Sequence, residues 1–178
     1  MQENAAGGTS REAPFPVRTC LWFDQDGEEA ARFYVSLLPG SHVGDVFRPE
    51  PGGAALVVEF SLGGAPYMAL NGGPRYRPTP AASILVPTPD QRETDRLWDA
   101  LVGDGGEEGM CGWLTDRWGV SWQIVPRALP RLLIQSDRAA SARVMAALMT
   151  MKRIDVAALE AAARAAPEPR SDGGSTAA

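Results

Sequence analysis

Two stretches decide the fold: DGEEAARFYVSL (residues 26–37) and DQRETDRLWDAL (residues 90–101). Each begins with an aspartate, and a glutamate follows it three residues later. Counted from the aspartate, the positions four, seven, eight and eleven residues later are apolar in both stretches, except that the second has a threonine at the first of them. An acidic N-cap and this glutamate satisfy free N–H groups at a helix start. The repeat of apolar positions is that of one face of an amphipathic helix. The two stretches predict two helices that lie 64 residues apart in the chain.

Short strand-like runs flank both predicted helices. They are residues 18–23, 42–47, 55–62 and 66–70 around the first helix, and 82–86, 109–115 and 120–125 around the second. Leu62-Gly63-Gly64-Ala65 is typical of a hairpin turn, and Asp116-Arg117-Trp118-Gly119 of a type I turn. Strand, helix and then two or three strands therefore occur twice. This order predicts an α+β fold built from a duplicated βαβββ unit.

Bulk composition narrows the class of protein. A net charge of -5 argues against nucleic-acid binding, which needs clustered cations to neutralise phosphates. Two cysteines form neither a disulfide framework nor a CxxC metal pair. The sequence shows no signal peptide and no apolar run long enough to span a membrane, so we expect a cytoplasmic protein without membrane partners.

The segments outside the two units have their own patterns. Residues 1–16 and 167–178 are polar and rich in Gly, Ser, Ala and Pro, which predicts disorder at both ends. Residues 127–166 predict further helices, with Ser136-Asp137 before a stripe at Val144, Ala147, Leu148 and Met151, and with Asp155 capping a last short helix. These helices bury their apolar faces either on the same chain, which we expect, or on a partner subunit.

Three stretches resemble one known family. TCLWFDQDGEEAARFYVSLLPGS (19–41), PYMALNGGPRY (66–76) and CGWLTDRWGVSWQIVP (111–126) are similar to the PhnB-like, or 3-demethylubiquinone 3-methyltransferase-like, branch of the glyoxalase/bleomycin-resistance (vicinal-oxygen-chelate) superfamily. RVMAALMTMKRIDVAALEAA (143–162) is similar to the C-terminal helices of that branch.

The resemblance implies an architecture. Residues 17–126 would form the vicinal-oxygen-chelate domain, with units at about 17–72 and 81–126, as a curved mixed sheet around a concave cup with added C-terminal helices. It also implies a homodimer and a small organic ligand. The methyltransferase label carries little chemistry here, because the chain lacks the Gly-rich strand-to-helix loop of nucleoside-binding methyltransferases.

Metal-dependent members of the superfamily hold a divalent cation with His, Gln or Glu on the first and last strands of each unit. The resemblance places Thr19, Ala82 or Ser83, and Gln123 at such positions. Only Gln123 is a ligand type, and a neutral amide alone holds a metal weakly. His42, the one histidine, lies off these positions and is interpreted as a surface or strand-edge residue. We therefore expect no metal and no cofactor.

Strand alternation and motif position give the candidate ligand-binding residues. If Gln123 faces the cup, Ser121 and Val125 do so too, while Trp122 and Ile124 face the helices. The predicted ligand-binding residues are Thr19, Leu21, Phe23, Asn71, Trp113 and Gln123. Of these, Asn71 is equally well explained as a turn residue, and the apolar side chains as packing residues.

The sequence offers few candidate catalytic residues. Cys111 has no histidine near it in the sequence and is interpreted as a packing residue, and Asp24, Glu59 and Asp116 remain as possible general bases. The sequence favours a metal-free protein that binds a small organic molecule in an apolar cup. The alternatives are a lyase, isomerase or dioxygenase of the superfamily with a weakly held metal, and a drug-sequestering resistance protein.

Overall fold

The computed structural model describes residues 17–165, and the disorder predicted for residues 1–16 and 167–178 lies outside them. The chain divides between Tyr76 and Arg77 into two compact units. Within the described part, no helix has the length and apolar character needed to cross a membrane.

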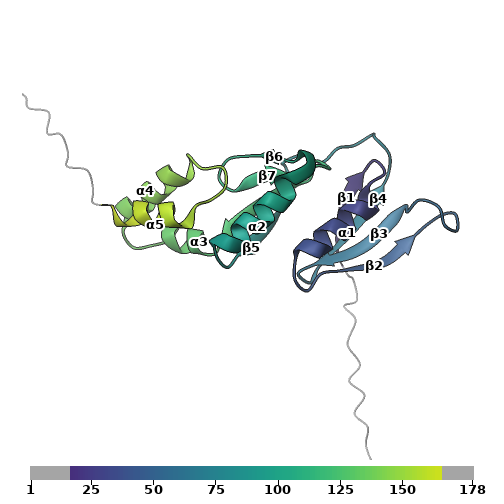
Figure 1. The fold of residues 1–178 in the computed structure, drawn as a ribbon, viewed down its shortest axis with the longest axis horizontal. Helices are drawn as coiled ribbons and strands as arrows, with labels where there is room; N and C mark the ends of the chain where they lie inside the picture. Colours follow the sequence, from purple (N-terminus) through teal and green to yellow (C-terminus); the bar gives the residue numbers. More distant parts are fainter. Residues whose placement is uncertain (1–16, 166–178) are drawn as a thin grey trace, which may run out of the picture. The chain divides into compact units, whose positions relative to one another are not determined.

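The first unit is a four-stranded mixed sheet with one helix (Figure 1). Its elements are β1 (Thr19–Phe23), α1 (Gly27–Leu37), β2 (His42–Phe47), β3 (Val57–Leu62) and β4 (Ala65–Asn71). The strand order is β1-β4-β3-β2, in which β1 and β4 are parallel and the other neighbours are antiparallel.

The second unit repeats this topology. Its elements are β5 (Ser83–Thr88), α2 (Gln91–Val102), a 3-10 turn η1 (Gly103–Gly105), β6 (Glu107–Glu108), β7 (Trp113–Thr115) and β8 (Ser121–Pro126). The order is β5-β8-β7-β6, again with one parallel pair, β5 and β8. The predicted α+β fold with two βαβββ units is confirmed. Strand β6 was not predicted, because two exposed glutamates carry no apolar alternation.

Each helix buries the stripe that predicted it, though not equally. In α2, all four stripe residues are buried, among them Leu97 and Trp98. In α1, Ala30 and Tyr34 are buried, while Phe33 is half-buried. The Tyr34 ring lies 6.5 Å from the ring of Phe60 on β3, so α1 packs on one face of the first sheet.

The two helices begin differently, and here one prediction is wrong. Asp90 caps α2 as predicted, its Oδ1 accepting from the Glu93 backbone N–H at 2.8 Å. Asp26 makes no side-chain cap on α1. Instead Asn71 Oδ1, from the end of β4, accepts from the Gly27 N–H at 2.8 Å. Gly27 permits this approach, because a Cβ there would lie 2.7 Å from Asn71 Oδ1.

Both predicted turns are present. Leu62 and Ala65 are register partners across the β3–β4 hairpin, and Gly63 and Gly64 between them have φ of 54° and 88°. Positive φ at both central residues is the mark of a type I′ hairpin turn. The Gly119 N–H donates to the Asp116 carbonyl at 2.9 Å, which closes the second turn.

Three helices follow β8: α3 (Ala128–Leu133), α4 (Arg138–Leu148) and α5 (Val156–Arg164). Asp137 and Asp155 cap α4 and α5 as predicted. The helices share an apolar cluster formed by Leu129, Val144, Leu148, Ile154 and Leu159. They therefore pack on the same chain, as expected from the sequence.

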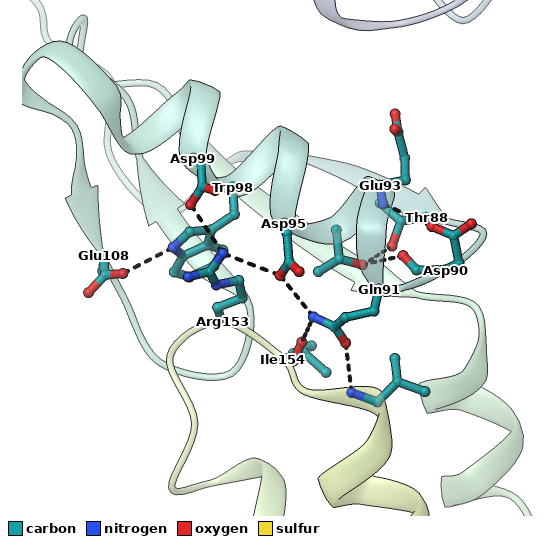
Figure 2. A network of polar contacts seen from close by, with 12 residues as sticks. Thr88, Asp90, Gln91, Glu93, Asp95, Trp98, Asp99, Glu108, Arg153 and Ile154 are labelled. Carbon is teal, nitrogen blue, oxygen red and sulfur yellow. Dashed lines mark hydrogen bonds and ion pairs between the residues drawn. The ribbon is translucent and has the colours of Figure 1, made fainter.

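A polar network ties the segment before α5 to α2 (Figure 2). The Gln91 amide donates to the Ile154 carbonyl at 3.0 Å and accepts from the Val156 N–H at 2.9 Å. Arg153 Nη1 lies 3.2 Å from Asp95 and 3.1 Å from Asp99. Gln91 lies on α2, whereas its two backbone partners lie just before α5 and at its first residue. These hydrogen bonds therefore hold the C-terminal helices on the second unit.

Candidate functional site

The second sheet has one face that α2 leaves uncovered. Buried Trp122 and Ile124 alternate with half-buried Gln123, so the first two face α2 as predicted. Register pairs Gln123 with Leu85 on β5 and with Trp113 on β7, which places these three side chains together on the uncovered face. Leu85 remains 54% exposed. We call this surface the Gln123 face.

A hydrogen bond on the Gln123 face links two of the expected metal-ligand positions. Gln123 Nε2 donates to Ser83 Oγ at 2.8 Å. Of the two residues left open by the sequence, Ser83 is therefore the one on this face, and Ala82 precedes the strand. Neither an amide nor a hydroxyl carries the charge that a tight divalent-cation site needs.

Three of the predicted ligand-binding residues, those on β1, do not lie on the uncovered face of the first sheet. Thr19, Leu21 and Phe23 lie on the α1 side of the first sheet, where Phe23 is buried and would contact a Cβ on Gly27 at 3.1 Å. The physical reason is loop length. Three residues separate β1 from α1, whereas two separate β5 from α2, and one extra residue reverses the side to which alternating side chains point.

The uncovered face of the first sheet therefore carries the other residues of β1. Cys20 and Trp22 lie there, in register with Met68 and Leu70 of β4. The Trp22 indole N–H donates to the Gly73 carbonyl at 2.8 Å, and its ring packs edge-to-face on Tyr76 at 5.0 Å. An indole held at both its nitrogen and its ring edge is a rigid part of this face.

Asn71 makes one bond to the protein through each end of its side-chain amide. Besides accepting from Gly27, its amide donates from Nδ2 to the Ala55 carbonyl at 2.9 Å. Asn71 is the last residue of β4 and does not belong to the following turn. Its side-chain hydrogen bonds join β4 to Gly27 and to Ala55. It does line a hollow of about 430 Å³ beside the start of α1. Ligand binding by Asn71 stays a prediction.

Charged side chains at that hollow form an ion-pair group. Glu28 accepts from Arg32 at 2.8 Å and, with both carboxylate oxygens, from Arg48 at 2.8 and 2.7 Å. The hydrogen bonds from Arg32 and then Arg48 hold the pKa of the Glu28 carboxyl below its usual range. The pairing joins the first turn of α1 to Arg48, the residue after β2. The charged groups of this ion-pair group bond to one another, and none of them is a nucleophile of the serine or cysteine type.

Most candidate catalytic residues have structural partners. Asp116 is buried and accepts from the backbone of Trp118 and Val120 and from the Trp122 indole. Cys111 donates to the Leu148 carbonyl at 3.5 Å and packs against the C-terminal apolar cluster, as interpreted from the sequence. Within residues 17–165, no group of three or more His, Cys, Asp or Glu side chains is placed to hold a metal ion.

One group of polar residues was not predicted from the sequence. His42 Nδ1 and Ser61 Oγ are 2.9 Å apart, and both line a hollow of about 270 Å³ with Arg18, Gly44, Glu59 and Pro66. Arg18 and Glu59 form an ion pair. We call this the His42 hollow. Alternation along VVEFSL (57–62) would have placed Glu59 and Ser61 on one face, but the pairing with His42 depends on strand register.

Comparison with known proteins places the fold. The model of the 3-demethylubiquinone-9 3-methyltransferase family matches residues 16–125, more than half of the chain. The chain belongs to this family. No curated protein matches it.

Two solved structures are similar to it. One is a putative 3-demethylubiquinone-9 3-methyltransferase, PhnB protein, from Bacillus cereus, with 29% identity and a TM-score of 0.57 over 62% of this chain and 98% of that one. The other is protein PA1353 from Pseudomonas aeruginosa, with 24% identity and a TM-score of 0.52 over 63% and 97%. The resemblance to the PhnB-like branch is thereby confirmed, and the second likeness supports the fold alone.

Proposed function

We propose that this protein binds a small organic molecule without a metal, on the Gln123 face. The observation that carries the proposal is the hydrogen bond from Gln123 to Ser83. It uses one amide N–H of Gln123, the one residue of ligand type among the expected metal positions, and it fixes the amide so that Oε1 can accept from a ligand. A fixed polar group of this kind sets the orientation of a bound molecule.

The lining of the face supports a partly apolar ligand. Leu85 and Trp113 lie beside Gln123 in register, so apolar area surrounds a small number of polar atoms. Binding sites for small molecules commonly have this composition. The aromatic ring of Trp113 offers a stacking surface for a planar ligand.

Methyl transfer is not part of the proposal, although the family and the Bacillus cereus relative carry that name. Nucleoside cofactors bind doubly wound parallel sheets at the Gly-rich turn after the first strand. Both sheets here are four-stranded with one parallel and two antiparallel pairs, and β1 is followed by Asp24-Gln25-Asp26. This arrangement supplies no cradle of that kind.

A thermal-shift screen of planar organic compounds tests the proposal, with mass spectrometry of each hit to detect products. A compound that binds only the folded protein raises its melting temperature. Leu85→Asp should abolish the shift by placing a charge on the Gln123 face. Ile134→Asp is the matched control, because Ile134 is 84% exposed and belongs to none of the strands that form that face.

Two outcomes would contradict the proposal. One is a set of hits that stabilise the Leu85→Asp variant as much as the parent. The other is a stoichiometric transition metal in protein purified without chelator that disappears, together with ligand binding, in Gln123→Ala. The homodimer implied by the resemblance stays a prediction, which light scattering of the purified protein tests directly.

A further inference from the structure

We propose that the His42 hollow is a second binding site, which takes a small carboxylate and binds it more tightly when His42 is protonated. The proposal goes beyond the function above, because the residues of the hollow lie in the first unit and none belongs to the Gln123 face. It rests on three features of the hollow: strand register, charge and space.

Strand register builds the hollow. His42 on β2 is paired with Ser61 on β3, and Ser61 with Pro66 on β4. Ser61 is only 9% exposed, and its hydroxyl holds His42 Nδ1 at 2.9 Å. The imidazole is thereby oriented through one nitrogen, while His42 itself is exposed and no hydrogen bond to Nε2 occurs within residues 17–165. Nε2 is the atom that meets a ligand.

The charge of the hollow depends on His42. The charges of Arg18 and Glu59 cancel in their ion pair, so the local charge is near zero with a neutral imidazole and positive with a protonated one. A carboxylate accepts from the Nε2–H of the imidazolium and lies near the Arg18 guanidinium. Charge-assisted bonds of this kind are about twice as strong as neutral ones.

The other titratable groups near His42 do not obscure this change. Burial raises the pKa of the Tyr67 hydroxyl and of the Cys20 thiol, so neither group adds charge to the hollow between about pH 5.5 and about pH 8. Asp45 lies on β2 itself and is exposed. On α1, Glu28 is bonded to Arg32 and also to Arg48, which follows the far end of β2.

The geometry favours binding over nucleophilic catalysis. A serine–histidine nucleophile needs a third group that orients the histidine through its other nitrogen, and donors for an oxyanion. In the described residues nothing bonds to the other nitrogen of His42. The pair is suited to hold an anion in place, and the proposal includes no covalent step.

Space limits the ligand. A hollow of about 270 Å³ suits a compact molecule. Gly44 lies opposite Glu59, and a Cβ on Gly44 would meet the Glu59 carbonyl oxygen at an ordinary 3.4 Å. Gly44→Val should therefore fold and fill part of the hollow.

Benzoate is the probe, and benzamide is its neutral counterpart of similar shape. Because His42 is the only histidine, its imidazole Cε1–H gives a single assigned NMR signal. We expect benzoate to shift this signal and to bind about tenfold more tightly at about pH 5.5 than at about pH 8, because a protonated imidazole adds a positive charge to the hollow. Benzamide should bind weakly at both.

Variants separate the parts of the proposal. His42→Gln should keep the fold and remove the pH dependence, and Gly44→Val should abolish benzoate binding. Asp45→Asn removes a nearby charge outside the hollow and should keep the pH dependence. Leu85→Asp should leave benzoate binding intact, so the two proposed sites fail or stand separately. Equal affinity for benzoate and benzamide, or a pH dependence that survives His42→Gln, would overturn the proposal.

Discussion

The first βαβββ unit holds the start of its helix through a distant strand, whereas the second holds it through the adjacent residue. Asn71 of β4 accepts from Gly27 of α1 across 44 positions of sequence. Asp90 accepts from Glu93 across three positions. The two helices have the same sequence signature, and the comparison shows that an Asp-x-x-Glu pattern marks a helix start without determining which side chain caps it.

A second difference lies in what each unit packs against. The sheet of the first unit has α1 on one face. The second unit carries α2 and, in addition, three C-terminal helices joined through the apolar cluster and through the Gln91 and Arg153 network (Figure 2). The second unit therefore has a larger interior, and loss of packing in the helices should reach its sheet.

The largest expected effect tests whether the helices and the second sheet unfold together. Leu159 is fully buried in the apolar cluster, so Leu159→Ala should lower the free energy of unfolding of the second unit by about 2–5 kcal/mol. Hydrogen exchange resolved by residue is the measurement. Amides of β8 should lose protection together with those of α5, while Ile134→Ala, at an exposed position, should change little.

If only α4 and α5 lose protection in Leu159→Ala, the helices are a separate folding unit and the second comparison fails. Protection in β3 and β4 of the first unit serves as the internal reference, because neither strand belongs to the apolar cluster.

An intermediate effect is expected at the cap of α1. Asn71→Ala removes the partner of the Gly27 N–H and of the Ala55 carbonyl, and both of these residues are buried. Leaving a buried polar group without a partner costs about 1–3 kcal/mol. Urea denaturation should show this loss, whereas Asp26→Ala should be close to neutral. The reverse ranking of the two variants would restore Asp26 as the cap.

The smallest effect is expected at the exposed cap of α2. Asp90→Ala removes the acceptor of the Glu93 N–H and should cost about 1 kcal/mol, as is typical of an N-cap replaced by alanine. Asp90→Ser should recover most of that loss, because serine also caps. A loss in Asp90→Ala as large as that in Asn71→Ala would remove the distinction between a local and a distant cap.

The elements and their order follow from local patterns in the sequence. The stripes of α1 and α2, the Gly63-Gly64 turn, the Asp116 turn and the Asp137 and Asp155 caps all depend on residues within one helix or turn. Such signals are local, so their physical cause is present in a few neighbouring residues. The facing of Trp122 and Ile124 followed from alternation along one strand.

Only the tertiary structure decided which faces meet and which distant side chains pair. One additional loop residue before α1 turned Thr19, Leu21 and Phe23 toward the helix, because side-chain direction in a strand reverses with every residue. The Asn71 cap and the His42–Ser61 pair depend on register between strands that a turn or loop of variable length connects. Helix starts that look alike in sequence are thus held by different residues. His42 is exposed on the edge strand β2, as interpreted from the sequence, and register between β2 and β3 adds its contact with Ser61.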